Sequence, residues 1–455
     1  MHSAFSTGRN IAIIGSGISG MSAAWLLSQR HRVTIYDRAE HIGGHANTVE
    51  VDAGDGTIAV DTGFIVFNDR NYPNLNALFG HLDVPVAKSD MSFAVSSDNG
   101  RFEYGGAAPS MLFGQRRNLI RPDFWRMLID IRRFYAEAKE SFADTPETMT
   151  LRAYLGQHRL GHAFVRDHLL PMTAAIWSTP TEHMLDYPAQ SLLRFLDNHG
   201  LLGLSNRPQW STVQGGSREY VKRLTAGFRD RIRLNTAVEA VTRLPDGVRI
   251  EDRQGGVEEF DEVVFACHAD EALALIKDPD GAEQRMLRAF RYQRNVAMLH
   301  TDRALMPKRR RVWASWNYLT RQASANDEAQ QLCVSYWMNR LQPLPTRHDL
   351  FVTLNPVEQP AEGTILRSVP YDHPVFDAAT VRMRSLIWNI QGHRNTWFCG
   401  SYLGDGFHED GIQAGLAVAE ALGGVRRPWS VENESGRLSL PPGWPELMTT
   451  TRKAA

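Results

Sequence analysis

The stretch NIAIIGSGISG, residues 10–20, decides the fold of the N-terminal part of this chain. Residues 10–14 predict a short buried strand, Gly15, Gly17 and Gly20 follow directly, and residues 21–28 have the composition of a helix. Such a unit makes a tight turn, brings its backbone close to a pyrophosphate and packs its helix on the strand, with the helix N-terminal amides facing the anion. Only glycine meets all three demands, so the stretch predicts a dinucleotide site.

A second strand and an acidic residue complete this pattern. Residues 32–36 predict the strand, and Asp37 lies directly after it, about twenty residues beyond the glycines. A carboxylate at this place accepts hydrogen bonds from the adenosine ribose and disfavours a 2′-phosphate. Glycine turns alone are common, but strand, glycines, helix, strand and acid in this order make dinucleotide binding a strong prediction.

The composition is that of an ordinary globular protein large enough for two domains. The chain has 455 residues, of which 43% are hydrophobic and 22% charged, and its net charge is -1. The absence of a basic excess argues against nucleic acid as a partner. Cys267, Cys333 and Cys399 are far apart in the sequence and suit a reducing, cytoplasmic compartment. The apolar residues 11–27 are interrupted by the glycines, so we expect neither a signal peptide nor a membrane span.

Two motifs after Asp37 favour FAD over NAD. They are IGGH at residues 42–45 and VDTGF at residues 60–64. With these motifs the chain resembles the flavin-containing amine oxidase, protoporphyrinogen oxidase and phytoene desaturase superfamily, whose members place a Gly-Gly pair beside the cofactor. In that family the pair usually precedes Arg or Lys, and here His45 stands in the place of the cation. A protonated or donor imidazole substitutes for it in part, and the alternative is a loop histidine without that role.

The resemblance implies an α/β fold, with a discontinuous Rossmann-like FAD-binding domain and an inserted α+β substrate domain. Residues 263–266 are fully apolar, as in a strand of a parallel sheet covered on both faces, and mark the return to the FAD-binding domain. We assign residues 1–90, 205–272 and 379–425 to the FAD-binding domain, 91–204 and 273–378 to the substrate domain, and 426–455 to an extended C-terminal tail. The FAD-binding residues that the resemblance implies are Gly15, Gly17, Ile18, Ser19, Gly20, Asp37, Arg38, Gly43, Gly44, His45, Thr62, Gly63, Val238, Gly400, Gly411 and Ile412.

The second cofactor signature of the resembling family lies near the C-terminus. Residues 396–400 predict the last strand, and a helix is predicted over residues 411–422. This arrangement would bring Gly411, Ile412 and Gln413 to a helix N-terminus, where backbone amides face the flavin or the pyrophosphate. The family's usual acid is replaced here by Ser401, which leaves Asp405 and Asp410 as alternatives for the ribityl contact.

Residues 43–45, 171–180, 300–302, 313–318 and 406–411 resemble a bacterial subgroup, some of whose members are similar to an acyl-chain desaturase of furan fatty acid formation. The resemblance implies an FAD-dependent oxidoreductase that abstracts a hydride from a small-molecule or lipid acyl-chain substrate to form a double bond. His300, His408 and Asp410 are the candidate catalytic residues. A double-bond isomerase, an amine oxidase, although no lysine near the flavin N5 is identified, and a flavin-free lipid- or prenyl-binding protein are the alternatives. The sequence has no metal-ligand or serine-hydrolase motif, and no metal is expected.

Aromatic and basic stretches each allow two interpretations. Strand-like pieces between residues 273 and 378 place five aromatic residues either along an apolar cavity or in a plain core; these are Trp313, Trp316, Tyr318, Tyr336 and Trp337. Residues 123–139 predict an amphipathic helix, and residues 116–133 contain six arginines against two aspartates. This region is either a solvated helix face or a peripheral contact with the inner face of the membrane.

Overall fold

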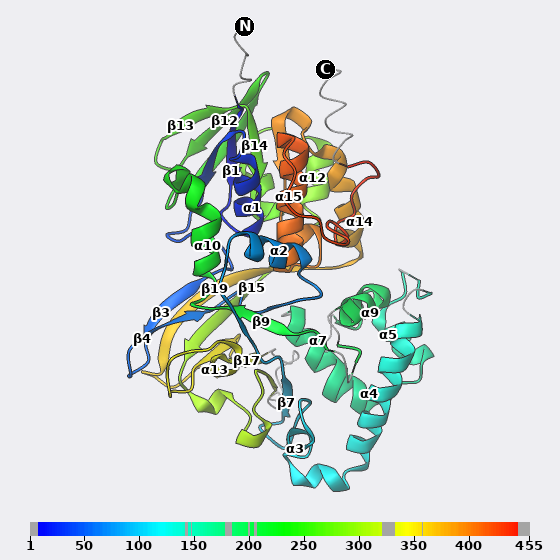
Figure 1. The fold of residues 1–455 in the computed structure, drawn as a ribbon. Helices are drawn as coiled ribbons and strands as arrows, with labels where there is room; N and C mark the ends of the chain where they lie inside the picture. Colours follow the sequence, from blue (N-terminus) through cyan, green and yellow to red (C-terminus); the bar gives the residue numbers. More distant parts are fainter. Residues whose placement is uncertain are drawn as a thin grey trace.

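A five-stranded parallel sheet occupies the upper part of the molecule in the computed structural model (Figure 1). The structure describes residues 8–141, 144–146, 148–177, 184–198, 201–203, 207–320, 333–356 and 358–444. The strands are far apart in sequence, as the apolar strand near residue 263 predicted. In order across the sheet they are β10 (Ile232–Arg233), β2 (Arg32–Tyr36), β1 (Asn10–Ile14), β14 (Glu262–Phe265) and β20 (Thr396–Phe398), and all neighbours are parallel.

Two long helices and a small antiparallel sheet cover the parallel sheet. The helices α1 (Ile18–Leu27) and α15 (His408–Gly423) pack closely, because a Cβ atom on Gly415 would lie 2.3 Å from the Ser19 carbonyl oxygen. The small sheet comprises β11 (Val238–Leu244), β12 (Gly247–Asp252) and β13 (Val257–Phe260), and it shares one apolar core with these helices. The predicted α/β, Rossmann-like fold class is confirmed.

A seven-stranded sheet forms the floor of the second half of the molecule. Neighbouring strands of this sheet are antiparallel, except for the parallel pair β7 (Phe93–Ser97) and β16 (Trp316–Leu319). The hairpin of β3 (Thr48–Asp52) and β4 (Thr57–Asp61) packs its apolar side chains against this sheet. The order is β19 (Ile365–Val375), β15 (Arg291–His300), β18 (Phe351–Leu354), β17 (Cys333–Trp337), β16 (Trp316–Leu319), β7 (Phe93–Ser97) and β8 (Phe102–Gly105).

A group of helices adjoins this sheet, and they share an apolar core with side chains of β7, β8, β16 and β17. The predicted amphipathic helix is α4 (Pro122–Ser141), which buries Phe124 and Tyr135. Among the described residues no helix is long and apolar enough to cross a membrane. The other helices of this group are α3 (Pro109–Leu112), η1 (Arg116–Ile120), α5 (Leu151–Gln157), α6 (His162–Phe164), η2 (Val165–Leu169), α7 (Leu170–Trp177) and α9 (Ala189–Asn198).

Shorter elements connect these layers. The strands among them are β5 (Phe67–Asn68), β6 (Val86–Lys88) and β9 (Trp210–Val213). The helices are α2 (Pro73–His81), α10 (Arg218–Thr225), α11 (Ala269–Leu275), α12 (Gly281–Leu287), α13 (Met338–Leu341) and α14 (Ala378–Leu386).

Residues 426–444 pack against α1 and α15, whereas the composition predicted an extended tail over residues 426–455; residues 445–455 lie outside the described part of the chain. Arg427 is buried and pairs with Glu420 of α15, with Nε and Oε1 2.8 Å apart. Trp429 stacks on Trp25 of α1 at a ring-centroid distance of 5.6 Å. The segment is therefore held by the buried Glu420 carboxylate, seven residues before Arg427, and by the ring of Trp25, which lies near the other end of the chain. Composition alone reveals neither contact.

Candidate active site

The glycine turn between β1 and α1 forms an open cradle. Gly15 has a φ of +109°, and a Cβ atom there would lie 2.7 Å from the Ala266 carbonyl oxygen. A Cβ atom on Gly20 would lie 2.0 Å from the Gly15 carbonyl oxygen, so this glycine allows close packing of helix and strand. A Cβ atom on Gly17 would have no atom within 4 Å. Gly17 therefore faces open space at the start of a helix, where backbone amides and the helix dipole favour a phosphate.

Asp37 lies beside this turn at the end of β2, as the sequence predicted. One carboxylate oxygen accepts hydrogen bonds from the backbone amide of Ser16 at 2.8 Å and from its hydroxyl, and the other accepts from the Ala39 amide at 2.9 Å. The adjacent Arg38 is exposed and forms an ion pair with Glu271 at 2.7 Å. Asp37 thus braces the glycine turn itself, and its predicted contact with the ribose stays a prediction.

His45 follows Gly44, which lies against the glycine turn. Gly44 has a φ of +59°, and a Cβ atom added to it would lie 3.1 Å from Gly17 Cα. Burial lowers the pKa of the His45 imidazole well below its usual value, and the neighbouring His373 adds to this effect. The imidazole is therefore neutral at neutral pH, so His45 offers this site a hydrogen-bonding group and no positive charge. Its Nε2 atom is buried and has no hydrogen-bond partner among the described residues.

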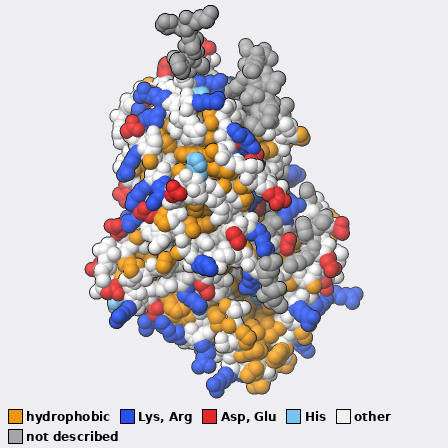
Figure 2. Space-filling model, in the orientation of Figure 1, with side chains coloured by type: hydrophobic (Ala, Val, Ile, Leu, Met, Phe, Trp, Pro, Cys, Tyr) orange, Lys and Arg blue, Asp and Glu red, His pale blue; other side chains and the backbone are white. Residues whose placement is uncertain are grey.

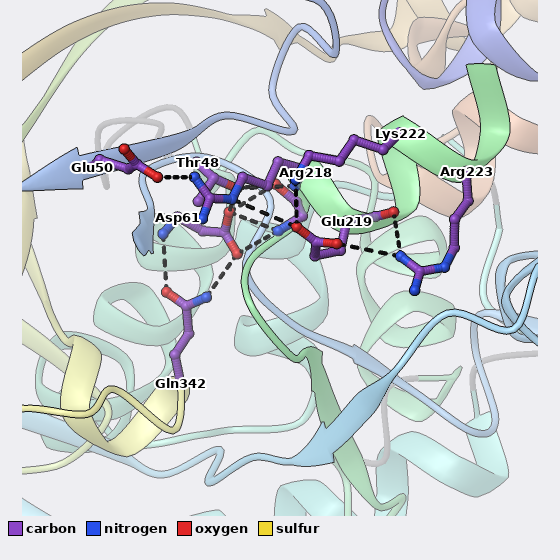
Figure 3. Close-up of polar contacts among 9 residues, drawn as sticks. Thr48, Glu50, Asp61, Arg218, Glu219, Lys222, Arg223 and Gln342 are labelled. Carbon is purple, nitrogen blue, oxygen red and sulfur yellow. Dashed lines mark hydrogen bonds and ion pairs between the residues drawn. The ribbon is translucent and has the colours of Figure 1, made fainter. Parts of the chain in front are cut away.

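Asp61 ties this region to the rest of the protein, as Figure 3 shows. Its carboxylate accepts hydrogen bonds from the Ser217 amide at 3.0 Å, from the Thr48 hydroxyl at 2.5 Å and from the Gln342 side-chain amide at 2.7 Å. Burial raises the pKa of Asp61 to about 6, although these donors favour the ionised form. The network fixes the next two residues, Thr62 and Gly63, which face the site.

The second signature is shifted by one turn relative to its predicted position. The helix α15 begins at His408, and the Gly411 amide already donates to the Phe407 carbonyl oxygen at 3.1 Å. Gly411 instead faces α1, because its Cβ atom would lie 2.7 Å from Ile18 Cγ2. The start of the helix is set earlier by Asp410, which accepts a hydrogen bond from the Phe407 amide at 2.7 Å.

These elements surround one large cavity of about 980 Å³. Three of the predicted aromatic residues, Trp313, Tyr318 and Trp337, do not line it, whereas Trp316 and Tyr336 do. The predicted site residues that line the cavity are Gly15, Gly17, Ile18, Ser19, Asp37, Arg38, Gly44, His45, Thr62, Gly63, Val238, Gly400 and His408. Gly20, Gly43, Gly411, Ile412, His300 and Asp410 are not among the lining residues.

Of the three candidate catalytic residues, only His408 lines the cavity. Its ring stacks on Phe64 at a centroid distance of 3.7 Å, and its Nε2 atom lies 2.8 Å from the Tyr220 hydroxyl. Burial lowers the pKa of His408 to about 3, so the ring is neutral.

The other two candidates are satisfied within the fold. His300 is fully buried, with Nε2 2.7 Å from the Thr353 hydroxyl and Nδ1 accepting from the Asp302 amide at 3.1 Å. Asp410 is fully buried and pairs with Arg437 at 3.3 Å. Asp405, the second alternative for the ribityl contact, does line the cavity and pairs with Arg384 at 3.1 Å.

Several cavity residues carry no sequence signal. Tyr371 of β19 places its hydroxyl 2.8 Å from the Thr62 hydroxyl and stacks its ring on His45 at 4.7 Å. Tyr220 lies behind the cavity lining and reaches His408 from α10, and Tyr402 lines the cavity although its hydroxyl is buried. Each belongs to a segment distant from its partner, and no fixed spacing identifies such residues from the sequence alone.

The cavity fits a bound FAD by two local tests. The first test is space: Gly17 has no side chain, and the open space beside it lies at a helix N-terminus, where a pyrophosphate can bind. The His45 Nε2 atom and the Tyr402 hydroxyl are buried without a hydrogen-bond partner among the described residues, and both residues line the cavity. Buried polar atoms are normally hydrogen-bonded, so these two are suited to contact a polar cofactor.

Comparison with known proteins supports the same cofactor. The profile of the family described as flavin containing amine oxidoreductase matches residues 18–343. The crystal structure of a CLA-producing fatty acid isomerase from P. acnes is similar at a TM-score of 0.64 and 15% identity, over 90% of this chain and 97% of that one. Cyclohexylamine oxidase from Brevibacterium oxydans IH-35A is similar at a TM-score of 0.62 and 15% identity, over 91% and 99% of the two chains.

A curated relative matches over a shorter stretch. Carotenoid phi-ring synthase from Streptomyces griseus is 39% identical over 75 residues, which are 16% of this chain and 14% of that protein. The solved structures show the fold, whereas the family profile covers most of the chain, including the motifs at residues 42–45 and 60–64. The chain therefore belongs to the flavin containing amine oxidoreductase family and is an FAD-dependent oxidoreductase.

Proposed function

We propose that this enzyme removes a hydride from an apolar, fatty-acyl-type chain and so forms a double bond. The observation that carries the proposal is the lining of the cavity outside the nucleotide loops, which is dominated by apolar and aromatic side chains. They include Met91, Ile176, Phe195, Leu201, Trp316, Tyr336, Val352, Leu354, Phe376 and Phe407.

The part of the cavity outside the nucleotide loops has few charged groups, and most of them are paired or neutral. Asp405 is paired with Arg384, and burial lowers the pKa of His373 to about 4, so that this histidine is neutral. Asp372 is a carboxylate of β19 on the lining. No lysine is present among the described lining residues, so the cavity offers little to a substrate selected by charge.

The chemistry is divided between cofactor and protein. FAD supplies the hydride acceptor, while a proton leaves the neighbouring carbon as the double bond forms. We propose that the apolar walls hold the chain and exclude water, and that neutral His408, backed by the Tyr220 hydroxyl, receives or relays the proton. A pKa near 3 makes His408 a weak base, so it holds the proton only in passing, and Tyr220 orients the ring through its hydroxyl at Nε2.

The test is anaerobic mixing of the flavoprotein with phospholipids carrying monounsaturated or methylated acyl chains. Loss of the oxidised-flavin absorbance, with one double bond gained per flavin reduced, supports the proposal. His408→Ala should slow this reduction with FAD still bound, whereas the exposed His348→Ala should not. Unchanged absorbance and unchanged lipids with every chain tested would contradict the acyl-chain proposal.

A second candidate is redox-neutral migration of a double bond. The fold likeness to a fatty acid isomerase favours testing it, since the same cavity could serve both reactions. Mass spectrometry separates them: the isomerase moves a double bond under turnover without net flavin reduction or change of mass. A protein that cannot be loaded with FAD would instead favour a lipid-binding role.

We also propose the cytoplasm as the compartment of this enzyme. Cys267 and Cys399 are free thiols in the structure. Free, largely buried cysteines are usual in a reducing compartment. Measurement of free thiols in protein isolated without a reductant tests this assignment.

A further inference from the structure

The end of the molecule farthest from the two termini carries an exposed apolar tip. Figure 2 shows hydrophobic side chains gathered there, over the region where Figure 1 places α3 and the start of α4, with Lys and Arg side chains around them. The exposed fractions are 50% for Leu119, 81% for Ile120, 44% for Trp125 and 60% for Ile129. These are four of the eight large hydrophobic residues that are exposed in the described chain, and they fall within eleven residues of sequence. We call them the apolar tip.

A basic cleft adjoins the apolar tip. It has a volume of about 1040 Å³ and is lined by seven arginines, namely Arg101, Arg116, Arg117, Arg121, Arg309, Arg310 and Arg311. The short helix η1 contributes to both features, because Arg116 and Arg117 face the cleft while Leu119 and Ile120 belong to the tip. The cleft and the tip are therefore one continuous surface.

Few carboxylates neutralise this cleft. Arg309 pairs with the buried Glu103 at 2.8 Å, and Arg310 pairs with Asp349 at 3.0 Å. Within the described chain, the other five arginines have no ion pair with a carboxylate. The pKa of Arg121 is lowered by partial burial and then by the adjacent Arg117 and Arg309, which reflects how closely the like charges are placed. An anionic partner would relieve this repulsion.

We propose that this surface docks the enzyme on an anionic phospholipid bilayer, with lipid phosphates in the arginine cleft and the apolar tip inserted among the acyl chains. A bilayer offers negative charge and hydrocarbon side by side, which matches both halves of the surface. A second copy of the chain meeting the same face would bring two arginine clefts together, which is electrostatically unfavourable. Duplex nucleic acid would satisfy the arginines but leave Ile120 without an apolar environment.

The surface lies outside the substrate cavity, so the proposal does not depend on the substrate. Binding of the FAD-loaded protein is measured by co-sedimentation with vesicles of phosphatidylcholine alone or mixed with phosphatidylglycerol. Wild-type protein should bind the mixed vesicles, and binding should fall as salt screens the arginine cleft. Arg116→Gln with Arg117→Gln should weaken binding about 25-fold, at roughly fivefold per arginine. Ile120→Asp should weaken it about 10-fold or more.

Matched variants elsewhere on the surface provide the controls. Arg285→Gln with Arg288→Gln removes two exposed arginines outside the cleft, and Val257→Asp alters a residue that is 63% exposed on β13. Both should bind within about twofold of wild type, because their sites lack the combination of charge and apolar tip. Flavin content and thermal unfolding verify that every variant is folded.

Three results would overturn the proposal. The first is wild-type protein that does not bind the anionic vesicles, or tip and cleft variants that bind as well as wild type. The second is a dimer in solution that Ile120→Asp dissociates, which would assign the surface to a second copy. The third is binding to duplex DNA that competes with vesicles and is unaffected by Ile120→Asp, which would assign it to nucleic acid.

Discussion

Gly17→Val should weaken FAD binding strongly without unfolding the protein. A Cβ atom at this position meets nothing within 4 Å, so the apoprotein accommodates the side chain. The isopropyl group would instead occupy the space through which a pyrophosphate approaches the helix N-terminus. Steric overlap costs about 1–3 kcal/mol, and one lost charge-assisted hydrogen bond costs about 1.5–3 kcal/mol. Together they weaken FAD binding by roughly two to four orders of magnitude.

Two other glycines separate cofactor loss from misfolding. Gly80 of α2 also has open space around its Cβ position, but it lies outside the cavity, so Gly80→Val should retain FAD. At Gly20 a Cβ atom would lie 2.0 Å from a backbone oxygen, so Gly20→Val should destabilise the apoprotein itself. The three positions therefore predict three different outcomes from the same chemical change.

The assay has two parts. FAD is released from each purified variant and quantified per protein, and apoprotein is then titrated with FAD to obtain Kd. Thermal unfolding of the apoproteins shows whether each fold is intact. The reasoning is refuted if the Gly17 variant binds FAD as tightly as wild type, or if its apoprotein is as unstable as that of the Gly20 variant.

Buried polar groups give three further predictions. Asp61→Asn should lower the free energy of unfolding by about 2–4 kcal/mol, because the new amide group faces hydrogen-bond donors. Chemical denaturation measures this loss, and Asp230→Asn at an exposed position is the control. The pKa of His408 falls from 6.5 in the unfolded chain to about 3 in the folded protein. Protonation of the unfolded chain should therefore reduce the free energy of unfolding as the pH drops from 6.5 toward 3, by up to about 1.4 kcal/mol per pH unit. The pH dependence of thermal unfolding should be shallower in His408→Phe, and an identical slope would contradict the assignment. Arg427→Met should cost about 1–3 kcal/mol, because it removes the buried hydrogen bonds to Glu420 and leaves that carboxylate with Arg426 alone, and an unchanged denaturation midpoint would show that residues 426–444 do not support the fold.

Local sequence was sufficient wherever a structure depends on neighbours in the chain. The residues of β1, β2 and the glycine turn follow from apolar runs and from steric demands that only glycine satisfies. The start of α15 was misplaced by one turn, because Asp410 caps the helix at Phe407 and Gly411 serves packing against α1. A glycine that permits close packing and one that faces a ligand look the same in a sequence.

The candidate catalytic residues show where local patterns stop being informative. His300 and His408 are both buried histidines, but only one lies on the cavity. Thr353 on a neighbouring strand engages His300, whereas Phe64 and Tyr220 fix His408 at the cavity wall. These partners lie between 53 and 344 residues away along the chain, so only folding determines them.

By itself the sequence determined the dinucleotide fold, the FAD-type motifs and the return of the chain to one parallel sheet. These features rest on short-range sterics and on the periodicity of apolar residues, which a linear chain displays directly. The tertiary structure decided the neutral state of His45, the union of nucleotide loops and apolar walls in one cavity, and the meeting of the arginine cleft with the apolar tip. Burial and long-range proximity produce these properties, and both exist only after distant segments have packed together.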